Sequence, residues 1–190
     1  MGIRAVAGRA YREALPALAV SAGGGLIAGL VLGGMRAELR AVPGLLVLVP
    51  ALLATRGNVY GSLGARLSSG LHQGLIEPYA SISDRRVRVA VAAAVANGLL
   101  ASGFAAVAAW ITLGLLARPV APVGTLVAVA LLAGVLSGTV LVMAVLGVVF
   151  IGYRQGRNPD ALVGPVVTTT GDVFGLAFLV LAVRLVTGGG

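Results

Sequence analysis

The stretch NPDALVGPVVTTTGDVFGLAFLVLAVR, Asn158 to Arg184, places one carboxylate, Asp172, inside an otherwise apolar segment of helix length. If this segment spans a bilayer with roughly 30 Å of hydrocarbon, at about 1.5 Å rise per residue, Asp172 lies near its middle. An unpaired charge at that depth costs at least about 2.5 kcal/mol on insertion scales. We therefore expect the acid to have a function, and a cation site is the first hypothesis.

The composition of the whole chain predicts an integral membrane protein. Of its 190 residues 58% are hydrophobic and only 11% are charged. The mean hydropathy is +1.03, far above what one soluble core of this size can bury. The net charge of +8 comes from arginines in short connections and near helix ends, which is typical of anchoring at anionic lipid. No basic stripe with interleaved aromatics is present, so we expect no nucleic-acid partner.

Residue types that the chain lacks narrow its chemistry. There is no cysteine and only one histidine, His72, so thiolate sites and histidine metal clusters are excluded. A metal site would have to use oxygen ligands, which favour hard cations such as Mg²⁺. No phosphate-binding glycine loop, nucleophile elbow or zinc-protease motif occurs, so we predict that the protein is not an enzyme.

The apolar runs predict an all-α fold, a polytopic membrane protein of five transmembrane helices. We expect an N-terminal segment at residues 1–14, either an interfacial helix or a solvated basic tail, and one transmembrane domain at residues 15–187. A cleaved signal peptide is a weaker alternative. The five spans lie at about 15–34, 42–69, 87–116, 123–151 and 161–186. Pro16 is expected to open the first span, and residues 35–41 to form a short link.

The distribution of arginines predicts the orientation, because cytoplasmic loops carry an excess of positive charge. Five spans put the termini on opposite faces of the membrane. The N-terminal face would hold eight arginines and the other face three, which predicts a cytoplasmic N-terminus and an extracytoplasmic C-terminus in the cell inner (plasma) membrane. The eight are Arg4, Arg9, Arg12, Arg85, Arg86, Arg88, Arg154 and Arg157; the three are Arg36, Arg40 and Arg118.

Two spans carry polar or small residues at bilayer depth. In the last span, Asp172 follows GPVVTTTG, a run that exposes backbone and hydroxyl groups which a helix used only for packing would not need. In the second span, Gly57, Gly61 and Ala65 recur at four-residue spacing, which lets helix backbones approach closely. Asn58 lies beside Gly57 and is expected to line a pore.

Other charged residues have simpler expected roles. Arg56 and Arg66 are expected toward the ends of the second span, where they would snorkel or hold neighbouring helices. An ion pair with one of them is the structural alternative for Asp172. Asn158 and Pro159 should cap the last helix together with Asp160, which can also attract cations at the cytoplasmic mouth.

A single carboxylate compensates a divalent ion poorly, so the sequence favours a dimer that brings two copies of Asp172 together. Magnesium loses its water reluctantly. A wide site that holds the hydrated ion through water is therefore favoured over a closed cage of protein ligands.

Two motifs resemble the signatures of a known family. PALLATRGNVYGSLGARLSSGLHQG, Pro50 to Gly74, resembles the second-helix signature of the MgtE-like divalent cation transporters. NPDALVGPVVTTTGDVFGL, Asn158 to Leu176, resembles their last-helix signature, especially in the eukaryotic solute-carrier magnesium transporters and the half-length prokaryotic relatives. The cytoplasmic gating modules of bacterial MgtE have no counterpart in this chain, so their regulation by magnesium is not carried over.

The resemblance implies a homodimeric magnesium channel or transporter with its pore at the dimer interface. Magnesium would be the transported ion, with Mn²⁺ or Co²⁺ as further candidates, and a homologous non-identical half could replace the second copy. The predicted metal site comprises Asp172, Asn58, Gly57, Thr168 and Thr169. The predicted pore-lining or mouth residues are Gly61, Ser62, Gly171, Gly175 and Asp160.

Two rival functions remain at this point. One is a small membrane scaffold, or a subunit of a larger complex, that packs through its glycine-rich faces with Asp172 as structural helix glue. The other is a transporter of organic cations.

Overall fold

The computed structural model describes residues 3–79 and 83–188, which form helices joined by short turns. The helices are α1 (Ile3–Gly34), α2 (Arg36–Ala41), α3 (Leu45–His72), α4 (Arg85–Leu115), α5 (Val123–Arg154) and α6 (Pro159–Thr187). No strand occurs within these ranges, and the all-α prediction is confirmed.

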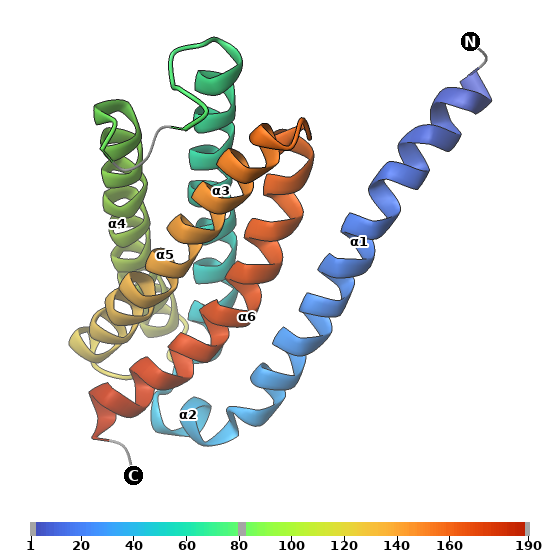
Figure 1. Cartoon of the computed structure of the whole chain (residues 1–190). Coiled ribbons are helices and arrows are strands. Elements are labelled where there is room, and N and C mark those ends of the chain that lie inside the picture. The colour runs from blue at the N-terminus through green and yellow to red at the C-terminus, as the bar shows by residue number, and fades with distance from the viewer. Residues whose placement is uncertain (1–2, 80–82, 189–190) are drawn as a thin grey trace.

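Helices α3 to α6 form a bundle, and α1 lies beside it (Figure 1). The most extensive contact joins α5 to α6, while α1 packs mainly on α6. Toward its beginning α1 diverges from the bundle, so that its first turns stand away from the other helices (Figure 1). Helix α6 therefore occupies the centre of the arrangement, in contact with α1, α2, α3 and α5.

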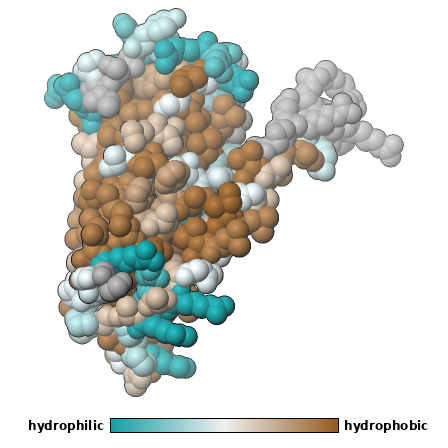
Figure 2. Space-filling model, turned by 60° about the horizontal axis from the view of Figure 1, so that its bottom comes forward, coloured by the Kyte–Doolittle hydropathy of each residue, from teal (hydrophilic) through white to brown (hydrophobic). Residues whose placement is uncertain are grey.

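Among the residues that the structure describes, four helices are long and apolar enough to cross a membrane, namely α3, α4, α5 and the part of α6 from Leu162 to Thr187. Figure 2 shows a broad hydrophobic surface with hydrophilic residues gathered at two opposite ends. Large apolar side chains such as Leu30, Phe104 and Leu115 are at least three-quarters exposed, which suits contact with lipid rather than water. The protein is thus a multi-pass membrane protein. The apolar stretch in α1, Leu18–Gly34, is shorter, and the fifth span stays a prediction.

The first half of the chain differs from the sequence prediction in the starts of two helices and in one additional short helix. Helix α1 begins at Ile3 and continues through Pro16, which therefore does not open it. The predicted link contains α2, because its sequence RAELRA consists of strong helix formers. Helix α3 begins at Leu45, after Gly44 takes a positive φ of 95°, a conformation that favours glycine.

Two later helices begin at side-chain caps. The Asp84 carboxylate accepts a hydrogen bond of 2.7 Å from the backbone N–H of Arg86, which starts α4 two residues before the predicted span. The Asn158 side chain accepts one of 3.1 Å from the N–H of Asp160, with Pro159 in the first turn of α6. The predicted cap of the last helix is therefore confirmed.

The core consists of two apolar clusters, one toward each end of the bundle. One is built around residues such as Leu48, Leu126 and Leu179, and the other around Leu67 and Val145.

Tyr60 joins three helices within the second cluster. It is 2% exposed, and its hydroxyl lies against the backbone of Gly98 in α4 and Gly138 in α5. A Cβ atom at Gly138 would overlap this hydroxyl, so glycine is needed there for close approach.

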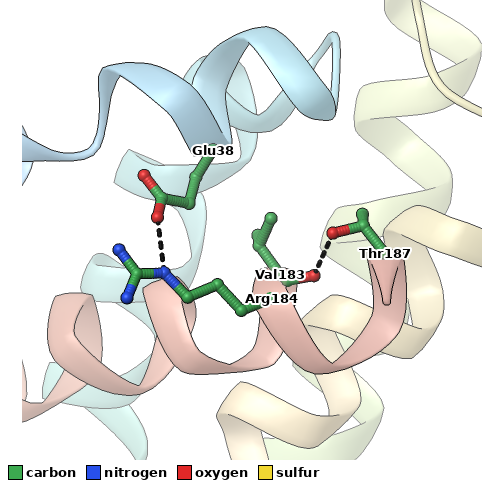
Figure 3. A network of polar contacts seen from close by, with 4 residues as sticks. All are labelled: Glu38, Val183, Arg184 and Thr187. Atoms are coloured by element: carbon green, nitrogen blue, oxygen red, sulfur yellow. Dashed lines mark hydrogen bonds and ion pairs between the residues drawn. The ribbon is translucent and has the colours of Figure 1, made fainter. Parts of the chain in front are cut away.

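One ion pair ties α2 to the end of α6. Arg184 Nε donates a hydrogen bond of 2.8 Å to Glu38 Oε1 (Figure 3). Glu38 is buried, whereas the side chain of Arg184 is 63% exposed. The hydrogen bond from Arg184 lowers the pKa of Glu38 below its ordinary value of 4.5. The sequence analysis assigned no role to either residue.

We expect Glu38→Gln to destabilise the protein by about 1 kcal/mol, because it replaces a charged acceptor while Arg184 stays largely hydrated. Since the folded state lowers the pKa of Glu38, this contribution is complete above pH 4.5 and is lost as the pH falls through the folded value. Thermal unfolding in detergent of Glu38→Gln, Arg184→Gln and the double variant measures the coupling energy between the two side chains. Arg40→Gln on the same helix is the control, and additive effects of the two single variants would contradict the pair.

Candidate functional site

Asp172 lies close to the midpoint of α6, a helix of 29 residues. Its side chain is half-buried. It forms no hydrogen bond or ion pair with any residue of the described ranges, and an ion pair with Arg56 or Arg66 is therefore not formed inside the chain. Asp172 is an available oxygen ligand in the middle of a membrane-spanning helix.

Two close contacts set the register between α3 and α6. A Cβ atom on Gly64 would stand 2.9 Å from Cγ2 of Val163, and one on Gly175 would stand 3.1 Å from Cδ2 of Leu53. Higher numbers in α3 thus meet lower numbers in α6, and the two helices are antiparallel.

This register sets the level of the acid. Asp172 precedes Gly175 by three residues, about 4.5 Å along the helix axis. Because Gly175 lies level with Leu53, Asp172 comes level with the turn of α3 around Arg56, just before Gly57 and Asn58. The acid and the Gly-Asn pair predicted from sequence therefore lie within about one helical turn of each other along the bundle.

Gly57 and Gly61 present an open surface on α3. An added Cβ atom on either glycine would meet nothing within 4 Å. In contrast to Gly64, these two glycines are not required by packing within this chain. Their backbone is accessible from outside the bundle, as a pore wall or a close contact with a second copy would need.

Arg56 lies in the interior, contrary to the expectation that it sits near a helix end. It is 3% exposed and occupies the gap between the two apolar clusters, with Nη1 2.6 Å from the position that a Cβ of Gly175 would take. None of its three guanidinium nitrogens has a hydrogen-bond partner. A buried, unpaired cation thus lies about one helical turn from Asp172.

The other predicted site residues on α6 lie on different sides of the helix. Thr168 is exposed, while Thr169 packs against Gly24 of α1 and its buried hydroxyl has no hydrogen-bond partner. Gly171 is buried against Leu141 of α5, and Gly175 against Arg56. Asp160 is exposed in the first turn, twelve residues or about 18 Å before Asp172 along the axis.

On α3, Asn58 and Ser62 are both exposed, and they line a groove shared with α4. This groove also contains Arg66 and Asn97 and has a volume of about 260 Å³. The sequence analysis assigned no role to Asn97. The sequence could have indicated a polar face on α3, because Asn58, Ser62 and Arg66 recur every four residues and therefore share one side of the helix.

His72, the one histidine of the chain, is held by contacts near the end of α3. Its Nδ1 lies 2.8 Å from the carbonyl oxygen of Ser68, and its ring meets that of Tyr153 edge-on. Within the described part of the chain no three His, Cys, Asp or Glu side chains group together as a metal site. Asp172 is therefore not part of such a cluster within the described residues of one copy.

The fold and the site define a polytopic helical membrane protein with an unpaired acid inside a spanning helix, the arrangement of a cation-transport protein. Residues 49–182 match the family model of the MgtE divalent cation transporters. Because the match covers more than half of the chain, the protein belongs to this family of transporters, which are not enzymes, and the predicted resemblance is confirmed. Searches of curated proteins and of solved structures found no match to the chain.

We expect Gly64→Ala to lower stability by about 1 to 3 kcal/mol, because the new methyl group would overlap the branched side chain of Val163. Gly61→Ala, on the open surface of the same helix, should unfold at the wild-type temperature. Thermal unfolding in detergent checks both variants. Equal stability of all three proteins would contradict the register of α3 against α6.

Proposed function

We propose that the protein transports Mg²⁺ as a homodimer that recognises a largely hydrated ion with paired Asp172 carboxylates. The observation that carries the proposal is the unpaired acid at the middle of α6, within about one turn of the level of Gly57 and Asn58 on α3. An intrachain role as helix glue would require a partner for the acid, and no residue of the described ranges provides one. Membership of the MgtE family supports a divalent cation as the substrate.

Charge compensation supports two copies of the chain. One carboxylate leaves a dication half neutralised, and within the described ranges Asp172 belongs to no group of three or more His, Cys, Asp or Glu side chains. A twofold axis beside α6 would bring two Asp172 side chains together without any additional ligand type. Gly57 and Gly61 of α3 would then form the adjoining wall of the pore, with Thr168 near the ion path.

Hydration supports magnesium as the ion. Mg²⁺ keeps several of its waters when it binds to a protein. A site with few carboxylates and many carbonyl or amide oxygens can hold the ion through hydrogen bonds to those waters. Asn58, Thr168 and the backbone at Gly57 offer such oxygens at the level of the acid or close to it. Mn²⁺ and Co²⁺ are the competitors to test.

The membrane potential suffices as the driving force for import. A dication that enters the cell down a potential of 100 mV, inside negative, gains about 4.6 kcal/mol, twice the value for a single charge. We place the protein in the inner (plasma) membrane with its N-terminus in the cytoplasm, as the arginine distribution predicts. In that orientation Asp160 stands at the cytoplasmic end of α6, where its charge attracts cations.

We expect Asp172→Asn to reduce Mg²⁺ flux in proteoliposomes to the level of empty liposomes, because the amide keeps the shape of the side chain and removes the charge. Glu77→Gln, which removes one exposed carboxylate from a connection, should keep wild-type flux. Size-exclusion chromatography of each variant confirms that folding is intact. Wild-type flux in Asp172→Asn would exclude the proposed site.

The absence of cysteine allows a direct test of the dimer. A thiol-reactive crosslinker with a spacer should join two chains that carry Asp172→Cys, because the proposed axis passes beside this position. Thr139→Cys, at an exposed position of α5, should remain monomeric on a denaturing gel. Equal crosslinking of both variants would indicate random collision, and failure to crosslink Asp172→Cys would contradict a twofold axis at α6.

A further inference from the structure

A second groove continues the one between α3 and α4 toward the end of the bundle where α3 ends and α4 begins. It has a volume of about 410 Å³ and shares Arg66 and Ala90 with the first groove. Arg85, Arg86 and Val89 of α4 complete its lining. The turns that end α3 and begin α4 lie together at one end of the bundle (Figure 1).

Three guanidinium groups line this second groove without an opposing acid. Arg66 and Arg85 have no hydrogen-bond or ion-pair partner among residues 3–79 and 83–188. Arg86 donates from Nη1 to the carbonyl oxygen of Leu75, which holds its guanidinium in place and leaves other N–H groups free. The nearby Asp84 carboxylate is used in the cap of α4.

Like charges around one cavity repel one another, and an anion that enters between them relieves this repulsion. Arginine binds phosphate oxygens with paired N–H donors, so the preferred anion is a phosphate group. The same three charges make this groove unsuitable for a cation. It is therefore distinct from the proposed Mg²⁺ site, although it adjoins the first groove, which Asn58 and Ser62 line.

The surroundings of the groove favour a phosphate that is part of a lipid. Val89 in its lining is 59% exposed, and apolar residues of both helices continue the wall toward the middle of the bundle, namely Val59, Leu63, Ala90, Ala93 and Ala94. Basic pockets between membrane-spanning helices bind anionic lipid headgroups in this way. A free phosphate ion would leave the apolar wall without a partner.

We infer that the groove between α3 and α4 is a binding site for an anionic phospholipid, whose headgroup phosphate is held by Arg66, Arg85 and Arg86. The inference does not depend on the proposed ion site, since its ligand has the opposite charge and none of its three arginines belongs to that site.

Native mass spectrometry of the full chain in detergent, titrated with phosphatidylglycerol, tests the site. Arg66→Gln should weaken binding about tenfold, because it removes charge-assisted hydrogen bonds to the phosphate. Arg66→Lys, which keeps the charge, should recover part of the affinity. Arg157→Gln loses the same charge at the same end of the bundle but outside this groove, and should bind like wild type.

Three results would overturn the inference. Equal affinity for phosphatidylglycerol and phosphatidylcholine would show that the headgroup charge is not recognised. Equal weakening by Arg66→Gln and Arg157→Gln would indicate general attraction to the positive surface. Displacement of the lipid by inorganic phosphate at millimolar concentration would identify a soluble phosphate compound as the ligand.

Discussion

The close contact between α3 and α6 is the constraint on which the rest of the structure depends. It is made at Gly64 and Gly175, where the glycine of one helix leaves room for a side chain of the other. Small residues allow such approach inside a membrane, where van der Waals packing replaces the hydrophobic effect as the force between helices. The contact determines which turn of α3 stands level with Asp172. It also turns Gly57 and Gly61 toward the outside, where a second copy of the chain can reach them.

The same contact encloses Arg56, and this burial changes the electrostatics around the acid. A guanidinium without hydrogen-bond partners is costly in an apolar interior, so an anionic neighbour stabilises it. Asp172 is the nearest acid along α6, about one turn away, yet the two side chains form no ion pair. The Asp172 carboxylate thus stays available for a cation, while the buried guanidinium of Arg56 provides a fixed positive charge about one turn away. A bare dication is repelled by that charge more strongly than an ion kept at a distance by its water.

Much of the fold could be predicted from sequence, because hydropathy and arginine placement are local signals. They located α3 to α6 within a few residues, and the cap at Asn158 followed from residue type. The course of α1 through Pro16 could not be predicted, since a proline at the start of a helix and one inside it look alike in sequence. Asp172 was identifiable because a charge inside an apolar run is conspicuous. The burial of Arg56 and its position against Gly175 depend on how two distant segments pack, which no single span reveals.

Helix α1 gives the structure a mechanical property. It touches α6 where Gly24 meets Thr169, three residues from Asp172, and it stands away from the bundle beyond that contact (Figure 1). From Gly24 to Ile3 the helix measures about 31 Å, and from Gly24 to Gly34 about 15 Å, at 1.5 Å per residue. The part from Gly24 to Gly34 packs into the apolar core through Ala28, Val31 and Leu32. Helix α1 is therefore anchored over about a third of its length, beside the turn that precedes Asp172, and projects as a cantilever over the rest.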